Sequence, residues 1–303
     1  MTRSANEDDD FTLVGREYRT HEVVPKRPGL WRSLRGKPVF SVSILSLIVL
    51  GCLFSGSIVN HDPGKFYLDH LSKPPDAEFF FGTDSLGRDI YSIIWRGGRA
   101  SISIGLLASC VATFIGVTYG CVAGMASKAI DNVMMRAVEL AQSVPSLLTV
   151  LLIVSLMGKQ NVLSISLVIG VTSWFALARI VRGEVRQIRG SEYVLAARCM
   201  GAGFLHIMGK HLIPNFVSAI MFVVISSVSL SMSMESTLSF LGFGLPVDVL
   251  SWGSMLALAD RALLLNTWWV IVIPGLFLVV TLLCITGVGN YFRRATNKRP
   301  SNL

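Results

Sequence analysis

Six blocks of about 20 residues with almost no charged side chains dominate this 303-residue chain. A run of that length crosses the hydrocarbon core of a bilayer, ~30 Å thick, as a single helix. The composition agrees, because 15% of the residues are charged while a soluble domain averages about 25%. We therefore predict an all-α polytopic membrane protein with six transmembrane helices. The blocks cover residues 40–59, 101–125, 137–157, 162–180, 216–234 and 268–288.

These blocks divide the chain into five parts. The third and fourth blocks are separated only by a short turn that contains Gly158, residues 158–161. The predicted parts are a cytoplasmic tail (1–37), a first transmembrane anchor helix (38–60), an extracytoplasmic segment (61–99), a five-helix core (100–290) with a cytoplasmic loop (185–215), and a second cytoplasmic tail (291–303).

Lysine and arginine residues indicate the orientation. If the N-terminus is cytoplasmic, residues 1–37, 126–136, 179–213 and 290–303 are inside and hold 20 of the 27 basic residues. Cytoplasmic flanks of membrane proteins are enriched in such residues, so we expect both termini in the cytoplasm. The net charge of +8 is then a signal of orientation, and nucleic acid is not expected as a partner.

Small residues recur at a spacing of four along the second block. This spacing places them in one stripe on a helix, where close approach of two backbones supplies the contact that drives association in lipid. We predict a helix-packing seam, either within the subunit or against a partner subunit. The alternative is the general abundance of small residues in membrane helices. The residues are Ala108, Ala112, Gly116, Gly120 and Gly124.

The loop between the fourth and fifth blocks predicts two short amphipathic helices. Ser191 can cap a helix that begins at Glu192 and places Tyr193, Ala196, Ala197 and Met200 on its apolar face. The run 201–203, Gly-Ala-Gly, then breaks the chain direction. A second apolar face of Phe204, Ile207, Met208 and Leu212 ends before Pro214. An ordinary interfacial loop is the alternative.

Three motifs carry a resemblance to a known family. Ala196-Ala197, Gly201 and the run 211–215 (HLIPN) are similar to the cytoplasmic loop of ABC-importer permeases, with Leu195 where that family has glutamate. The run 81–89 (FGTDSLGRD) resembles a signature before the second span of peptide-importer permeases. The run 238–244 (LSFLGFG), followed by 251–253 (SWG), resembles the segment after their fifth span. Together these matches cover residues of about 80 to 290.

The resemblance implies a type I ABC-importer permease fold and a role as the C-type subunit of a bacterial oligopeptide importer in the cytoplasmic membrane. Dipeptide, glutathione and nickel-chelate importers are the alternatives within the family. Implied partners are a second, non-identical permease, two ATP-binding subunits that hold ATP and magnesium, an extracytoplasmic solute-binding protein, the lipid bilayer and the peptide. The implied ATPase-coupling residues are Glu192, Ala196, Ala197, Gly201, Gly203, His211 and Pro214.

Other function classes fit the sequence less well. No Gly-Lys pair is followed by Ser or Thr in a phosphate-binding GxxxxGK[ST] frame, so we expect no ATPase site, no enzyme and no cofactor in this chain. An ion-coupled carrier usually has ionisable groups near the midplane, whereas Glu139 and Glu235 lie near block ends. Either glutamate could line a pathway or lie at the interface. The five histidines lie outside the blocks, and neither a metal site nor an intramembrane Ser–His pair is indicated.

The predicted outer segment contains Asp84, Arg88 and Asp89 on a stretch that can start a short helix. Opposite charges four residues apart are neighbours on a helix, and a surface ion pair of little energetic weight is the plain interpretation. The family resemblance implies instead part of the outer face on which the binding protein docks, or the outer gate beneath it.

Overall fold

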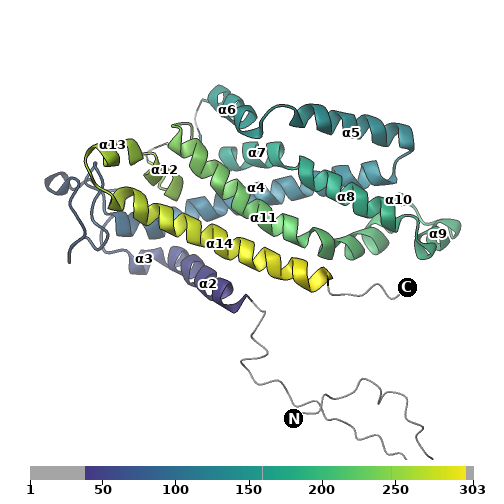
Figure 1. The fold of residues 1–303 in the computed structure, drawn as a ribbon, viewed down its shortest axis with the longest axis horizontal. Coiled ribbons are helices and arrows are strands. Elements are labelled where there is room, and N and C mark those ends of the chain that lie inside the picture. Colours follow the sequence, from purple (N-terminus) through teal and green to yellow (C-terminus); the bar gives the residue numbers. More distant parts are fainter. Residues whose placement is uncertain (1–37, 159, 247, 298–303) are drawn as a thin grey trace, which may run out of the picture. The chain divides into compact units, whose positions relative to one another are not determined.

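The computed structural model describes residues 38–158, 160–246 and 248–297, which are almost entirely helical. The predicted N-terminal tail, residues 1–37, lies outside the described residues. Along the chain (Figure 1) the elements are α2 (Val39–Leu53), α3 (Ser55–Ile58), η2 (Leu68–His70), α4 (Ile90–Met125), α5 (Lys128–Gln142), α6 (Ser146–Leu156), α7 (Val162–Ser173), α8 (Phe175–Ile188), α9 (Glu192–Cys199), α10 (Phe204–Ile207), the π-helix η3 (Met208–Leu212), α11 (Ile213–Phe240), α12 (Trp252–Leu256), α13 (Ala259–Leu264) and α14 (Trp269–Asn297).

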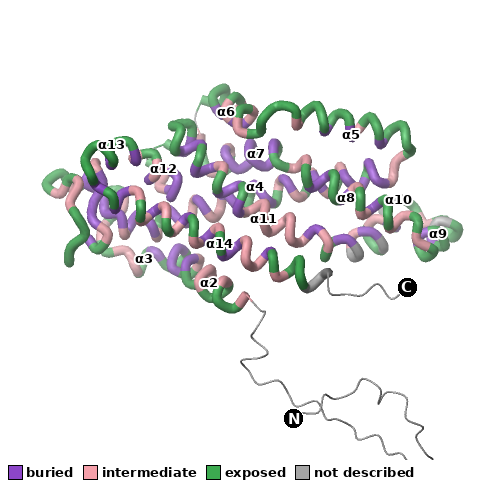
Figure 2. Tube along the Cα trace, viewed as in Figure 1, coloured by how far each residue is buried: buried purple, intermediate pink, exposed green. Residues whose placement is uncertain are grey.

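Helix α4 is the centre of the packing. It contacts α7, α8, α11 and α2, and α11 in turn packs against α14. Figure 2 shows the contrast that results: α4 is buried along much of its length, while α5 and α6 present mostly exposed residues. A helix that is apolar all round must be covered by other helices or by lipid. The all-helical membrane fold predicted from the sequence is confirmed.

The last five apolar blocks form helices of two kinds. Within the described residues, α4, α11 and α14 are long and apolar enough to cross a membrane. The pairs α5–α6 and α7–α8 pass the same test only together, bent by 77° and 47°. By length and composition the structure therefore has three candidate spans, or up to five if each bent pair is one span. The count of six spans stays a prediction.

The first block does not form one 20-residue helix as predicted. Helix α2 has 15 residues, and a single turn, α3, follows after Phe54. Arg99 from α4 explains the break: its guanidinium donates to the backbone carbonyls of Cys52 (2.6 Å) and Leu53. The last carbonyls of a helix have no partner within the helix, so this side chain caps α2 from outside.

Two predicted boundaries also move. The outer segment was expected to reach residue 99, but α4 begins at Ile90, because Asp89 caps its first turn and Ile93 and Ile94 are fully buried. The C-terminal tail was expected from residue 291, but α14 continues to Asn297. Residues 298–303 lie outside the described part of the chain.

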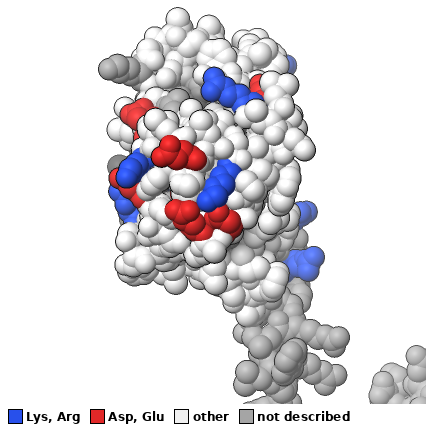
Figure 3. Space-filling model, turned by 90° about the vertical axis from the view of Figure 1, so that its left-hand side faces the viewer, with Lys and Arg blue, Asp and Glu red and all other residues white. Residues whose placement is uncertain are grey.

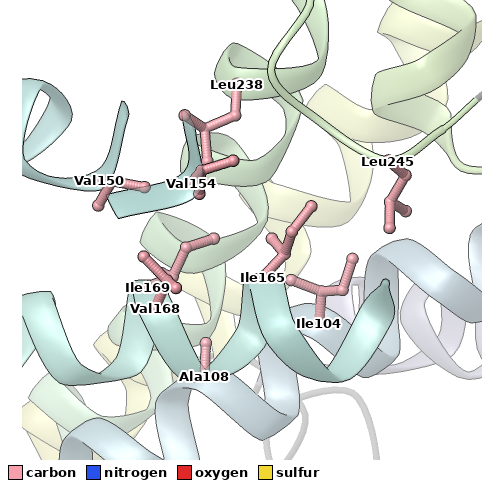
Figure 4. Close-up of a cluster of buried hydrophobic side chains, with 9 residues drawn as sticks. All are labelled: Ile104, Ala108, Val150, Val154, Ile165, Val168, Ile169, Leu238 and Leu245. Atoms are coloured by element: carbon pink, nitrogen blue, oxygen red, sulfur yellow. The ribbon is translucent and has the colours of Figure 1, made fainter. Parts of the chain in front are cut away.

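A buried cluster holds the bent pairs against α4 and α11. Figure 4 shows its nine apolar side chains pointing toward one another from α4, α6, α7, α11 and the loop after α11. In lipid such contacts stabilise through close packing rather than through removal of surface from water, so this cluster holds α6 and α7 against α4 and α11. The members are Ile104, Ala108, Val150, Val154, Ile165, Val168, Ile169, Leu238 and Leu245.

Candidate functional site

The loop between α8 and α11 forms a compact helical projection at one end of the bundle (Figure 1). Helix α9 begins at Glu192, as expected, and ends in a bend at Gly201, whose φ is +82°. The amide of Ala202 donates to the carbonyl of Ala197 at 3.0 Å, the six-to-one bond of a Schellman cap. The Gly201 bend is therefore the turn that the sequence predicted. The predicted cap at Ser191 differs, since its hydroxyl donates back to the carbonyl of Ile188 at 2.6 Å.

The buried face of α9 agrees with the predicted one only at Ala197. Val194 is fully buried and Ala197 is 5% exposed, and Val194 joins a core cluster with residues of α4, α8 and α11. Tyr193 and Met200, which were expected to be on the apolar inner face, are 47% and 81% exposed, and Ala196 is exposed as well. The apolar positions on both sides of a short helix left the buried side ambiguous in the sequence. Leu195, also exposed, adds to the outward apolar side.

The second half of the projection continues without a break into α11. Ile207 and Leu212 are buried as predicted, but the helix does not end before Pro214. Instead the π-helix η3 runs directly into α11, with the proline in the first turn of α11. Proline is tolerated there because the first turn needs no amide donor. The side chains of His211 and Pro214, both predicted coupling residues, lie outside the described part of the structure.

The stripe of small residues is a seam within the subunit. Ala108, Ala112 and the three glycines of the stripe are buried in α4. A methyl group at Gly120 would lie 2.6 Å from the carbonyl oxygen of Ala178, and one at Gly124 would lie 2.6 Å from a methyl group of Val185. Gly170 of α7 makes the reciprocal approach to Val111 and Ala108. The stripe therefore packs α4 against α7 and α8, which removes the alternative of a partner permease for these residues.

An ion cluster that the sequence analysis missed joins α5 to α8. Asp131 is 2% exposed, and its two carboxylate oxygens accept hydrogen bonds from Arg182, at 2.5 and 2.6 Å. Arg186 donates to the same carboxylate at 2.9 Å, and Arg189 donates to the carbonyl of Gly124 at 2.8 Å. Such bidentate pairs are strong and directional. The spacing of three to four between these arginines, on one face of a helix, was the available signal.

The outer segment holds its charged motif inside. Asp84 and Arg88 are 2% and 4% exposed, and the Nε of Arg88 donates to Asp84 at 2.8 Å. The two residues are not on a helix: they close a tight loop in which Gly87 has a φ of +75° and Thr83 bridges to Asp89. The interpretation as a surface pair on a helix is therefore wrong. The other carboxylate oxygen of Asp84 accepts the amides of Leu86 and Arg88, so the pair is hydrogen-bonded on both sides.

Asp89 connects this loop to the longest helix. Its carboxylate caps α4 by accepting the amides of Tyr91 and Ser92, and it lies 3.5 Å from Nδ1 of His61. The imidazole of His61 stacks on Phe79 at 4.7 Å. Nearby, the carboxylate of Asp76 accepts a hydrogen bond from the side chain of Lys73 and a second one from the amide of Phe79. These bonds, the one from Lys73 above all, hold the pKa of Asp76 below its ordinary value. The motif thus supports the packing of the outer segment and is not on its surface.

The two glutamates considered for a pathway have different surroundings. Glu139 is exposed on α5 and pairs with Arg136 at 2.8 Å. Glu235 is fully buried in α11 and accepts the hydroxyls of Ser239 (2.9 Å) and Ser251 (3.0 Å). Ser251 is the N-cap of α12, so Glu235 ties the segment after α11 back to α11. A pathway role for either glutamate stays a prediction.

Among the described residues, no group of three or more His, Cys, Asp or Glu side chains is placed to hold a metal ion. The five cysteines are Cys52, Cys110, Cys121, Cys199 and Cys284, and all of them are free thiols.

Comparison with known proteins identifies the family. Residues 116–299 match the model of the binding-protein-dependent transport system inner membrane component. The chain is similar to the dipeptide transport system permease protein DppC of Bacillus subtilis, 34% identical over 302 residues that cover 96% of this chain and 93% of that protein. It is similar to the oligopeptide transport system permease protein OppC of the same organism, 35% identical with 84% and 83% covered, and to OppC of Escherichia coli, 34% identical with 89% and 91% covered. The chain therefore belongs to the family of binding-protein-dependent transport system inner membrane components.

Proposed function

We propose that this chain is one of two non-identical permease subunits of a bacterial ATP-driven importer for oligopeptides. The observation that carries the proposal is the match to the binding-protein-dependent family together with a helical projection whose outer side is apolar. A dipeptide importer is the second candidate, because dipeptide and oligopeptide permeases match at nearly the same identity, 34% and 35%. Glutathione and nickel-chelate importers remain within the same family.

The projection at residues 185–215 is the proposed contact with the ATP-binding subunits. Ala197 and Val194 anchor α9 to the bundle, while Met200, Leu195 and Ala196 face outward. Exposed apolar side chains in a group of this kind mark protein interaction sites. ATP binding can shift the permease between inward- and outward-facing states only if these contacts differ between the two states. Glu192 and Gly203, both exposed, lie on the same projection.

The opposite end of the bundle is the proposed docking face for the solute-binding protein. Figure 3 shows acidic and basic side chains gathered on this end. The exposed acidic residues of the segment before α4 and of the segment between α11 and α14 are Asp62, Asp69, Asp76, Glu78, Asp248 and Asp260. Asp84, Arg88 and Asp89 support this face from within. Charged groups of both signs at a rim fix the register of an encounter and raise its rate. In this arrangement both chain termini lie in the cytoplasm.

The test is transport by a purified, reconstituted complex. Proteoliposomes that contain this chain, a second permease, two ATPase subunits and the binding protein should accumulate peptides when ATP is supplied. A series from dipeptides to longer peptides, with glutathione and a nickel chelate, identifies the substrate branch. Accumulation of peptide by the chain alone, driven by a proton gradient, would overturn the proposal in favour of an ion-coupled carrier.

A further inference from the structure

A pocket of about 600 Å³ lies at the end of the bundle that carries the outer segment. Its walls come from α3, the loop that follows α3, helix α4 and the loop after α11. It shares no lining residue with the larger cavity, about 870 Å³, which lies between the bent helix pairs and α11. Figure 1 shows α2 and α3 on the opposite side of the bundle from α5 and α6. The volume of the pocket is within the range of about 300–1,000 Å³ that is typical of small-molecule sites.

Contacts within the protein hold the walls of this pocket in place. The backbone amide of His61 donates to the hydroxyl of Ser92 at 3.3 Å, which ties the loop after α3 to α4. The loop after α11 packs on α4 at Gly97, where an added methyl group would lie 3.2 Å from backbone atoms of Ser251. A ligand therefore meets a preformed site.

The pocket presents charges of both signs. Arg96 of α4 supplies a guanidinium, and Asp62 and Asp248 supply carboxylates from two different loops. Among the described residues, the side chains of Arg96 and Asp248 make no hydrogen bond or ion pair, and the carboxylate of Asp62 accepts only the amide of Gly64, at 3.0 Å. Opposite charges that line one pocket without pairing with each other are complementary to a ligand that carries both an anionic and a cationic group.

A buried hydroxyl in the wall also lacks a partner. Ser55 is 0% exposed and lines the pocket, and its Oγ has no hydrogen-bonding partner among the described residues. Buried polar side chains are in most cases hydrogen-bonded to protein or to an ordered molecule. A polar group bound in the pocket would supply the partner that the protein does not.

The surface that leads to the pocket is apolar. Leu50, Leu53 and Phe54 share one side of the end of α2 and are 52%, 59% and 64% exposed. Ser55 and Gly56, both of which line the pocket, follow directly. An apolar stripe that ends at a charged pocket matches a phospholipid, whose acyl chains lie in the hydrocarbon core and whose headgroup lies just outside it. A soluble ligand would leave the stripe uncovered.

We propose that this pocket binds the headgroup of a zwitterionic phospholipid with a primary ammonium group, as in phosphatidylethanolamine. The guanidinium of Arg96 binds the phosphate, because its planar fork matches phosphate oxygens. The carboxylates of Asp62 and Asp248 bind the ammonium, and the acyl chains lie along the exposed side of α2. The site selects a lipid partner for the subunit and does not depend on which substrate is transported.

The test measures lipid affinity in the complex that is purified in detergent through a tag on this chain. Native mass spectrometry titrates phosphatidylethanolamine and phosphatidylglycerol with the same acyl chains, and only the first lipid carries an ammonium. Wild type should bind phosphatidylethanolamine about tenfold more tightly. The double variant Asp62→Asn, Asp248→Asn should lose that preference, and Arg96→Gln should weaken both lipids about tenfold. Asp260→Asn and Arg261→Gln, exposed on α13 and outside the pocket, are the matched controls and should change neither affinity.

A second arm uses thiol protection in the assembled complex. Asn60→Cys, in a background with the exposed Cys110 and Cys199 replaced by Ser, is labelled with a charged thiol reagent. Phosphatidylethanolamine should slow the labelling, while soluble glycerophosphoethanolamine at the same concentration should not. Equal affinity of wild type for the two lipids, unchanged affinities in the pocket variants, or protection by the soluble headgroup or by peptide would each overturn the inference. None of these readouts requires uptake, so a failure of the proposed function leaves the inference standing.

Discussion

Asp84 pairs with Arg88, and the two side chains are 3% and 5% exposed. Arg136 pairs with Glu139, and these side chains are 80% and 52% exposed. The two pairs have similar nitrogen–oxygen distances of 2.8 Å, so burial is the main difference between them. Loss of one member of a buried pair leaves a charge without compensation, while an exposed pair is solvated in any case.

We predict that Asp84→Ala destabilises the outer segment by about 3–5 kcal/mol. The control, Glu139→Ala, should cost less than about 1 kcal/mol because water replaces the partner of Arg136. Thermal unfolding of both variants in the same detergent measures the difference. Equal shifts of Tm in the two variants would contradict the role assigned to burial.

At the scale of the helices, α4 and α8 approach each other closely along the small-residue seam. The Gly120→Ala substitution adds a methyl group 2.6 Å from the carbonyl oxygen of Ala178, so the helices must separate. We predict a destabilisation of about 1–3 kcal/mol. Gly183→Ala, on α8 with no atom within 4 Å of the added methyl group, should be neutral or stabilising by up to ~1 kcal/mol. Folded yield and Tm, compared between the two alanine variants, give the result, and the seam would be disproved by equal behaviour.

The bend after α9 is the second prediction at this scale. Gly201 has a φ of +82° with open space around it, so the backbone conformation alone demands glycine. We expect Gly201→Pro to uncouple ATP hydrolysis from peptide uptake while membrane insertion is unchanged. Proline fixes φ near −65°, so the chain cannot form the bend that needs a φ of +82°. Gly201→Asn should restore much of the coupling, since asparagine tolerates a positive φ.

The coupling measurement is the number of peptides taken up per ATP hydrolysed in the reconstituted complex. Gly209→Ala is the matched control. A methyl group added at this position also meets no atom within 4 Å, but the φ of Gly209 is not positive. Normal coupling in Gly201→Pro would contradict the assignment of this bend to the ATPase contact.

For the whole molecule, family membership makes the chain a multi-pass inner membrane component and a transport subunit without catalytic function or cofactor of its own. It also implies a binding protein and ATPase partners. The two surfaces proposed for these partners lie far apart, because α9 is at one end of the bundle and α13 at the other (Figure 1).

The orientation can be tested directly. We predict that a reporter that is active only outside the cytoplasm is inactive when fused after Leu303 and active when inserted at Gly64 in the outer segment. The reason is the excess of basic residues in the predicted cytoplasmic segments, 20 of 27. The reverse pattern of activity would invert the proposed docking faces.

The sequence alone was sufficient for the helical membrane class, the family motifs, the glycine bend at Gly201 and the presence of a small-residue seam. Each of these depends on local composition or on a fixed spacing along one helix. The sequence did not indicate which side of α9 is buried, because Tyr193 and Val194 are both apolar and only contacts with α4, α8 and α11 distinguish them.

Only the tertiary structure decided the contacts between residues far apart in the chain. It placed the seam against α7 and α8 and brought Asp131 to Arg182. It brought Arg99 to the C-terminal end of α2 as well, so that these contacts join residues about 50 or more positions apart. It also brought two helix breaks and α11 around one uncharged cavity. The physical reason is that packing and desolvation depend on neighbours in space, whereas the patterns of a single sequence report only neighbours along the chain.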